Sequence, residues 1–317
     1  MSTQTETETA AQTRRGIRSR IQASPFLSGL LSNRLAIAGL SIIFVMLIIA
    51  LYARIFIGGI PPLTESHYTQ ITQSNLGSHP NLDTVPPSLR FLFGTDGFAR
   101  SIFPRVLYGA WLALKWGTVT VAISTTLGVG LGIIAAFYGD ITDNVIMRTM
   151  DMLLAFPSLL LALALVAIFG QGLENAVIAL VLVYTPRFAR VVRGAALTVL
   201  EDEFVDATIA LGATSPRVIV RHILPNCLAP VTVQSTLNFG LAIIDLAALS
   251  FLGFGAKPGT PSWGIMLSEG VENGLLTGVW WWSFFPGLFL ALTVLGFNLL
   301  GDGMRDALDP RMREAID

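Results

Sequence analysis

The chain has 317 residues, of which 53% are hydrophobic and 13% charged, and its formal net charge is −1. Soluble domains carry about 25% charged residues, so this composition predicts a membrane protein built from apolar helices of about 20 residues each. The near-neutral charge excludes a nucleic-acid footprint. A single cysteine, Cys227, excludes an internal disulfide or a cysteine metal cluster, and three scattered histidines offer no metal site.

The N-terminal region is predicted to be a polar tail followed by a membrane anchor. Residues 1–33 begin with a Thr/Glu-rich stretch typical of disorder and carry four arginines. The apolar run that follows is too long for the hydrophobic region of a signal peptide and has no small-residue cleavage site. We therefore expect a cytoplasmic tail at 1–33 and a first transmembrane helix at 34–57.

Six apolar runs are long enough to be spans, and a tight turn at 170–172 separates the third from the fourth. They lie near 35–57, 112–137, 152–170, 173–192, 231–252 and 281–301. With the N-terminus inside, the outer segments carry only Arg90, Arg100, Arg105 and Lys257, whereas the inner segments hold most of the arginines. The positive-inside rule then places both termini in the cytoplasm.

This topology divides the rest of the chain into an outer segment, a core and a tail. Residues 58–105 form an extracytoplasmic loop that is rich in proline, and we expect it to be irregular. Residues 106–303 form a core of five transmembrane helices with a cytoplasmic loop at 193–230. Residues 304–317 form a cytoplasmic C-terminal tail. A second outer loop, 253–280, is rich in glycine and proline.

Two glycines in the second span have the spacing of a close helix contact. Gly128 and Gly132 lie four residues apart, which lets helix backbones approach each other. We favour packing inside this subunit, with packing against a second membrane subunit as the alternative.

Residues 203–225, EFVDATIALGATSPRVIVRHILP, are a polar insert that begins with a predicted amphipathic helix. Phe204, Ala207 and Leu211 recur at spacings of three and four and form one apolar stripe. Glu203 and Asp206 lie in the first turns, where acidic side chains favour the helix dipole. A helix with an apolar stripe outside the membrane needs a groove to bury it, which predicts a partner protein.

The second half of the insert predicts another short helix after a bend. Gly212 is a helix stop, and Ser215 with Pro216 has the pattern of an N-cap and a first helical residue. Arg217 lies on this second helix, and Pro225 is expected to end it. The alternative is an interfacial helix lying on lipid, which predicts more basic residues than the first helix has.

The insert resembles the signature loop of membrane subunits in ATP-driven importers: E-A-A, three residues, G, nine residues, I-x-L-P. The chain has Asp206, Ala207 and Thr208, then Gly212 and, after nine residues, H-I-L-P, which ends at Pro225. It departs from the pattern at three positions, with Asp for Glu, Thr for the second Ala and His for the first Ile. In that family a separate ATPase contacts the membrane subunit at this loop.

Segments along nearly the whole chain are similar to the C-type permease subunit of the dipeptide/oligopeptide/nickel group of ABC importers. They are 94–96 (GTD), 105–110 (RVLYGA), 151–158 (DMLLAFPS), 249–255 (LSFLGFG), 261–264 (PSWG), 267–270 (LSEG) and 298–311 (NLLGDGMRDALDPR). The resemblance implies the type I importer permease fold, all-α, with an extra N-terminal helix.

The resemblance also implies a function and an assembly in a prokaryotic cytoplasmic membrane. The chain would be the pore subunit of an ATP-driven importer of di- and oligopeptides. It would work with a homologous B-type permease, ABC ATPase subunits and an extracytoplasmic substrate-binding protein. The implied ATPase-coupling residues are Glu203, Asp206, Ala207, Gly212, Arg217 and Pro225.

The chain has no sequence feature for binding ATP itself. No G-x-x-x-x-G-K-[ST] occurs, and the two lysines, Lys115 and Lys257, follow no glycine-rich phosphate loop. ATP and Mg²⁺ are therefore expected on the partner ATPase, and we expect no cofactor on this chain. No spacing of Ser, His and Asp indicates a nucleophile, and no H-E-x-x-H occurs, so a catalytic site is not predicted.

One acidic side chain inside a span is a candidate for the translocation pathway. Asp245 lies midway along the fifth span, where a carboxylate is costly unless it faces a pore or a partner. It is either a pathway group or a hydrogen-bonded structural acid. Arg148 and Asp151 are expected to form a local ion pair, and Pro157 is expected to kink the third span.

Two other functions stay open at this point. The same architecture could carry nickel or another small solute, since the binding protein may select the cargo. A self-contained secondary transporter predicts internal repeats and several intramembrane acids, and the sequence shows few such acids and no convincing repeat.

Overall fold

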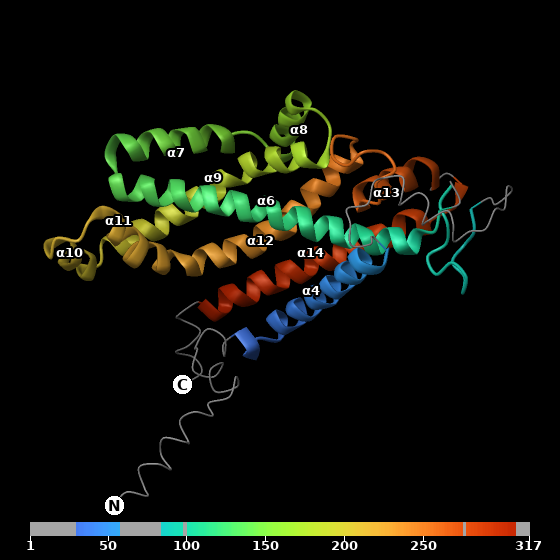
Figure 1. Ribbon diagram of the computed structural model, residues 1–317, viewed down its shortest axis with the longest axis horizontal. Helices are drawn as coiled ribbons and strands as arrows, with labels where there is room; N and C mark the ends of the chain where they lie inside the picture. Colours follow the sequence, from blue (N-terminus) through green and yellow to red (C-terminus); the bar gives the residue numbers. More distant parts are fainter. Residues whose placement is uncertain (1–29, 58–83, 98–99, 275–276, 309–317) are drawn as a thin grey trace, which may run out of the picture.

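The computed structural model describes residues 30–57, 84–97, 100–274 and 277–308. Within these ranges the chain is helical, and the only β-pairing is an isolated bridge between Thr95 and Ser101. The predicted tails at 1–29 and 309–317, and the proline-rich residues 58–83, lie outside the described part. Figure 1 shows long helices lying side by side in one elongated bundle.

The helices keep the order that the apolar runs predict. In chain order they are α4 (Arg34–Tyr52) with the π-helical turn η1 (Ala53–Ile57), α6 (Ile102–Tyr138), α7 (Asp140–Leu154), α8 (Ser158–Phe169), α9 (Leu173–Leu200), α10 (Glu203–Ala210), α11 (Ser215–Val218) with η2 (Ile219–Ile223), α12 (Leu224–Phe251), α13 (Trp263–Glu269) with η3 (Gly270–Gly274), and α14 (Trp281–Leu308).

Five of these helices are long and apolar enough to cross a membrane, and a sixth span results if the bent pair of α7 and α8 counts as one. The all-helical architecture is therefore confirmed. The third span differs from the expected single helix at 152–170, because α7 and α8 meet at 93°. Pro157 precedes α8; proline has no N–H to donate and disfavours helix at the residue before it.

The second span is longer than expected, because α6 begins at Ile102 rather than near 112. Tertiary packing explains the extension. Ile102 and Val106 are buried against Met266 and Trp282, and Arg105 is only 2% exposed. Residues 102–105 therefore belong to this helix and not to the irregular outer loop.

Gly128 and Gly132 lie where α6 packs against α9. A Cβ added to Gly128 would lie 2.3 Å from the Cβ of Phe188, and one added to Gly132 would lie 2.6 Å from the carbonyl oxygen of Ala189. Only glycine allows two backbones to come this close. The preferred interpretation, packing within this subunit, is confirmed.

The N-terminal helix α4 packs along α14. A Cβ on Gly39 would lie 2.6 Å from the backbone nitrogen of Leu300, so the two backbones nearly touch. Asn33 caps α4 by accepting a hydrogen bond from the Leu35 N–H, and its side chain donates to Asp306 Oδ2. Most apolar side chains of α4 stay exposed, as expected of a helix that faces lipid.

The two ends of the bundle differ in content. Figure 1 shows α10 and α11 at the end where α6 passes into α7, with α13 at the opposite end. Arg217 and Arg193 belong to the first end, and Arg100 and Lys257 belong to segments at the second. This separation of basic residues matches the predicted loop pattern.

Candidate functional site

The first predicted helix of the 203–225 insert is α10, and it projects from the end of the bundle. It begins after Asp202, which has extended backbone geometry, and it runs for eight residues. Glu203 and Asp206 lie in its first turn, and both are exposed. Their carboxylates favour the positive end of the helix dipole and are available to a partner.

Gly212 ends α10 in a left-handed conformation, with φ of +85°. The N–H of Ala213 bonds to the carbonyl of Thr208 at 3.2 Å, and the N–H of Gly212 bonds to that of Ile209 at 2.9 Å. This is the Schellman arrangement, in which the residue after the cap takes positive φ. A Cβ at Gly212 would meet nothing within 4 Å, so the demand for glycine is conformational and not steric. The predicted helix stop is confirmed.

The apolar face of α10 is split between the bundle and solvent. Val205 is its one buried residue, and it packs with Val218 and Ile223. The predicted stripe of Phe204, Ala207 and Leu211 is exposed, with Leu211 at 89%. Within the described residues, nothing covers this stripe. The sequence did not identify Val205 as the residue that packs α10 against the bundle. Apolar residues lie on every side of α10, so their spacing alone does not show which face is buried.

The second half of the insert departs from the prediction at both ends. Thr214, not Ser215, is the N-cap residue, so Pro216 is at the second helical position. The helix does not end at Pro225, because η2 leads without a break into α12. The N–H of Leu224 bonds to the carbonyl of Ile219, five residues back, and this wider π-turn accommodates a proline in the first turn of α12.

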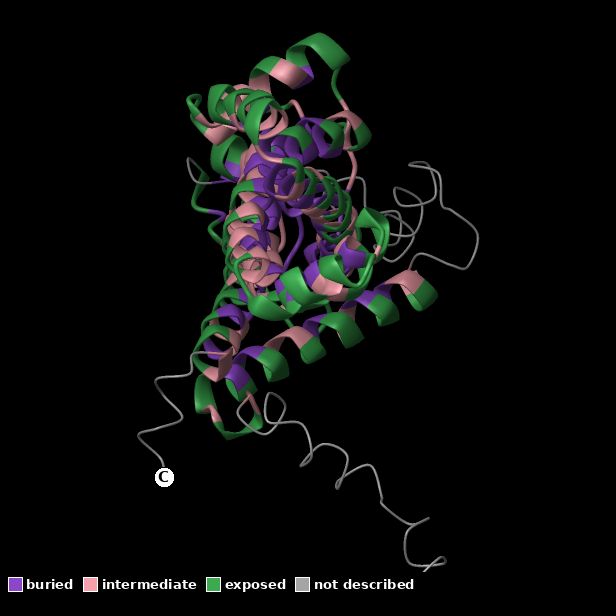
Figure 2. Cartoon of the chain, turned by 90° about the vertical axis from the view of Figure 1, so that its left-hand side faces the viewer, coloured by how far each residue is buried: buried purple, intermediate pink, exposed green. Residues whose placement is uncertain are grey.

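Residues from both halves together form one exposed surface, which we call the coupling surface. The ring of Phe204 lies 6.1 Å from that of His222, so α10 leans on η2. Figure 2 views the bundle from this end. The coupling surface consists of Glu203, Phe204, Asp206, Ala207, Leu211, Arg217 and Val220, all of them exposed.

Two ion pairs join α7 to α9 close to this end. Arg193 binds both carboxylate oxygens of Asp143, and Arg190 binds Asp151. The predicted local pair of Arg148 with Asp151 is wrong, because the antiparallel α9 places Arg190 opposite Asp151. Since α9 ends at Leu200 and α10 begins at Glu203, these pairs tie α7 to the helix that carries α10.

Asp245 lies on α12 and is bonded within this chain. The hydroxyl of Tyr184, on α9, donates to Asp245 Oδ2 at 2.7 Å, and the guanidinium of Arg187 lies 5.6 Å from the Tyr184 ring. The hydrogen bond agrees with the interpretation of Asp245 as a structural acid, although the residue is only half-buried. A pathway role for Asp245 stays a prediction.

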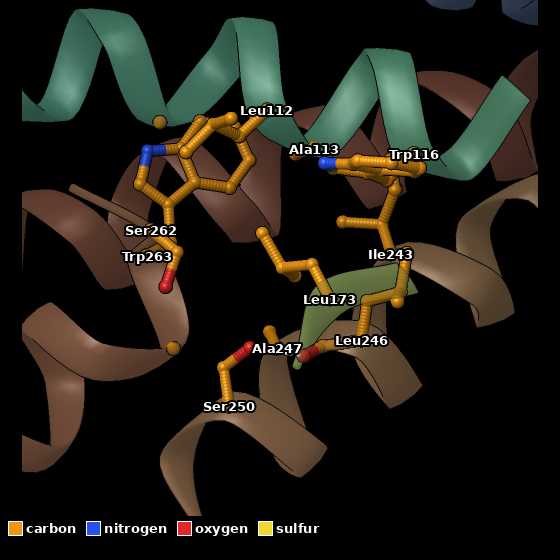
Figure 3. Close-up of a pocket in the computed structure, with 12 residues that line it drawn as sticks. Leu112, Ala113, Trp116, Leu173, Ile243, Leu246, Ala247, Ser250, Ser262 and Trp263 are labelled. Atoms are coloured by element: carbon orange, nitrogen blue, oxygen red, sulfur yellow. Dashed lines mark hydrogen bonds between the residues drawn. The ribbon is translucent and has the colours of Figure 1, made fainter. Parts of the chain in front are cut away.

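The opposite end of the bundle holds two adjoining cavities that the sequence did not reveal. Figure 3 shows the inner one, an apolar cavity of about 30 Å³ between α6, α12 and α13. The outer one is polar and measures about 550 Å³. No cluster of His, Cys, Asp or Glu in the described residues could hold a metal ion.

Comparison with known proteins agrees with this architecture. The family model for the binding-protein-dependent transport system inner membrane component matches residues 128–314. A dipeptide transport system permease protein of Alkalihalophilus pseudofirmus is 46% identical over 281 residues, covering 89% of this chain and 87% of the relative. A glutathione transport system permease protein of Escherichia coli is 39% identical over 281 residues, covering 89% and 88%.

A solved structure has the same fold. The inward-facing MetNI methionine ABC transporter contains a chain that aligns with a TM-score of 0.52 at 19% identity, covering 66% of this chain and 98% of that one. The chain is thus a multi-pass membrane permease subunit of the ABC transporter class. It belongs to the family of binding-protein-dependent transport system inner membrane components, and the predicted family is confirmed.

Proposed function

We propose that this chain is the pore-forming subunit of an ATP-driven importer of short peptides. Relatives named for dipeptide and di/tripeptide transport, each 46% identical to the chain, support the peptide cargo. The exposed apolar stripe of α10 supports the proposed contact with an ATPase, because proteins seldom leave a contiguous apolar patch exposed unless a partner binds it. A groove on a separate ATPase would bury this stripe.

The coupling surface would contact that ATPase through both of its halves. Phe204, Ala207 and Leu211 would enter an apolar groove, as helix-in-groove recognition requires. Glu203, Asp206 and Arg217 would form polar contacts at the rim, where charges steer association. The ATPase, and not this chain, would bind ATP and Mg²⁺.

The connections of the insert explain how ATPase closure would reach the membrane. α10 follows α9 after two residues, and η2 is continuous with α12. A displacement of the coupling surface would therefore shift α9 and α12 together. Gly212 gives α10 its fixed angle, and Pro225 lies where η2 enters α12. Bistable packing of helices is the usual way in which such shifts are amplified.

The complete importer would contain further subunits. We expect a homologous B-type permease, ATPase subunits and an extracytoplasmic binding protein in a prokaryotic cytoplasmic membrane. The end of the bundle that carries α10 would face the cytoplasm, together with both termini. Two ATPase domains would serve one pair of permeases.

Purification of the tagged chain from native membranes tests this proposal. We expect a P-loop ATPase and a second permease to co-purify, and the reconstituted complex to accumulate labelled dipeptide only with ATP and the binding protein. Accumulation driven by an ion gradient without partners would contradict the proposal.

A second candidate cargo is glutathione, because the glutathione permease relative is 39% identical over nearly the whole chain. It differs from a dipeptide in size and in its γ-glutamyl peptide bond, which leaves the α-carboxylate of the glutamyl residue free. Competition between labelled dipeptide and glutathione in the same vesicles distinguishes the two.

A further inference from the structure

The polar cavity at the α13 end of the bundle gathers charges that the proposed coupling role does not use. It measures about 550 Å³, within the range of about 300–1,000 Å³ typical of small-molecule sites. Its walls come from α6, from the turn between α8 and α9, and from the connection between α12 and α13. The lining residues are Trp116, Gln171, Gly172, Leu173, Glu174, Asn175, Lys257 and Thr260.

Hydrogen bonds hold the turn between α8 and α9 in place. The side chain of Asn175 donates to the carbonyls of Phe169 at 2.9 Å and Gly170 at 3.0 Å, which fixes the turn. The Gly172 N–H bonds to the carbonyl of Phe254 at 3.4 Å and so joins this turn to the segment that follows α12. These parts of the cavity wall are therefore preformed in the absence of a ligand.

The third wall, which carries Lys257, is also anchored. Ser250 Oγ accepts a hydrogen bond from the Ala256 N–H at 3.1 Å. The buried guanidinium of Arg105 donates to the Gly259 carbonyl at 3.5 Å, on the far side of Lys257. Trp263 Nε1 donates to the carbonyl of Val106 at 2.9 Å. Lys257 thus projects from a segment that is fixed on both sides.

Charges of both signs face this cavity. Glu174 and Lys257 line it, both are exposed, and neither forms an ion pair with any residue that the structure describes. The ammonium of Lys115 lies 4.3 Å from the ring of Trp116, which is another wall. Both lysines of the 317-residue chain therefore lie at or beside this one cavity.

The cavity adjoins the interior of the bundle. Trp116 and Leu173 line both the polar cavity and the apolar one, and Figure 3 shows them beside Ile243 and Leu246 of α12. The apolar cavity holds about 30 Å³, room for a water molecule but not a peptide. A ligand in the polar cavity would thus rest against the side chains that pack between α6 and α12.

We propose that this cavity is a transit site that holds both charged ends of a short peptide on its way into the pore. Lys257 binds the α-carboxylate and Glu174 binds the α-ammonium, while Trp116 and Leu173 pack against the side chains between them. Charge-assisted hydrogen bonds of this kind are about twice as strong as neutral ones. The inference rests on the proposed peptide cargo and adds to it a requirement for free termini.

Photo-crosslinking in the complete importer tests the site directly. Gln171 is replaced by the photoreactive residue p-benzoylphenylalanine in the reconstituted complex, which is supplied with binding protein, ATP and a radiolabelled dipeptide. We expect label on this chain that excess unlabelled dipeptide removes. The same replacement at Leu89, which is fully exposed and outside the cavity, should give none.

Charge-neutralising variants in the same assay test the assignment of the two ends. Lys257→Gln and Glu174→Gln should each lower the crosslink yield and the rate of uptake about tenfold, as expected for one charged hydrogen bond. Glu272→Gln, which removes an exposed carboxylate elsewhere on the α13 side, should change neither. Co-purification of the partner subunits verifies that each variant assembles.

The outcomes separate this inference from the proposed function. If the parent importer accumulates dipeptide but gives no peptide crosslink at position 171, and both variants transport normally, the transit site is wrong while the cargo stands. A crosslink at 171 to the binding protein alone would make the cavity a docking surface and overturn the inference. Absence of dipeptide uptake by the parent complex would overturn the proposed cargo as well.

Discussion

The hydroxyl of Tyr184 donates a 2.7 Å hydrogen bond to Oδ2 of Asp245, which joins α9 to α12 inside the bundle. Tyr184 is fully buried, and its ring also lies under the guanidinium of Arg187. The two helices that continue into the coupling surface are therefore also joined directly to each other, by side chains inside the bundle. This hydrogen bond would make α9 and α12 move together.

Removing the hydroxyl from Tyr184 should weaken the bundle. Tyr184→Phe preserves the ring and leaves the Asp245 carboxylate without its donor, which costs roughly 1–3 kcal/mol. The thermal midpoint of the purified permease should fall. In a double-mutant cycle, Tyr184→Phe should have almost no effect once Asp245→Ala, which offers the hydroxyl no acceptor, is present. Purely additive losses would show that the bond contributes nothing.

Gly212 should tolerate asparagine but not a bulky residue. The position needs positive φ and has open space around it, and asparagine visits this region more readily than other residues. Gly212→Asn should retain ATP-dependent uptake, whereas Gly212→Trp should abolish it while membrane insertion persists. Gly194→Ala is the matched control, because its added Cβ meets nothing and its φ is not positive. Normal uptake by Gly212→Trp would refute the role of the bend.

Substitutions at Leu211 and Val205 should affect different properties: the first should weaken binding of the ATPase, and the second should lower the stability of the permease. Leu211 is 89% exposed, so Leu211→Asp should leave the thermal midpoint unchanged but release the ATPase during purification. Val205 is fully buried, so Val205→Ala should lower stability by about 1–3 kcal/mol. Retention of the ATPase by Leu211→Asp would mean that the partner covers another face.

Gly128 and Gly130 form a matched pair on α6. A Cβ at Gly128 would collide with Phe188, whereas a Cβ at Gly130 would meet nothing within 4 Å. Gly128→Ala should lower the thermal midpoint by forcing α6 and α9 apart. Gly130→Ala should leave it unchanged or raise it, because alanine favours a helix over glycine by about 1 kcal/mol. Equal effects of the two substitutions on the thermal midpoint would indicate that the contact between α6 and α9 tolerates an added methyl group at Gly128.

The sequence predicted features that one residue type determines locally. The lengths of the apolar runs predicted the membrane spans. Gly212 predicted the end of α10, because the left-handed backbone conformation at a helix end favours glycine. Features that depend on distant residues were not predictable. Arg190 displaces Arg148 as the partner of Asp151 only because α9 packs beside α7.

The face of α10 and the bend of the third span illustrate the same limit. Apolar side chains surround α10, so periodicity alone could not show that Val205 is the buried one. Pro157 predicts a break in the third span, but the 93° angle between α7 and α8 depends on how α7 packs against α6 and α9. The polar cavity could not be predicted from the sequence either, because Trp116, Glu174 and Lys257, which line it, are far apart along the chain.

The unbroken helix from Ser215 to Phe251 would act as a lever with arms of unequal length in the proposed importer. Its short arm, α11 and η2, lies at the coupling surface, and its long arm, α12, leads to the segment that carries Lys257. The 28 residues of α12 extend about 42 Å at 1.5 Å per residue. A tilt of only about 10° at η2 would carry the far end through about 7 Å, a distance greater than one helical turn. In the proposed importer, a small movement of the ATPase would thus become a larger movement of the segment that carries Lys257.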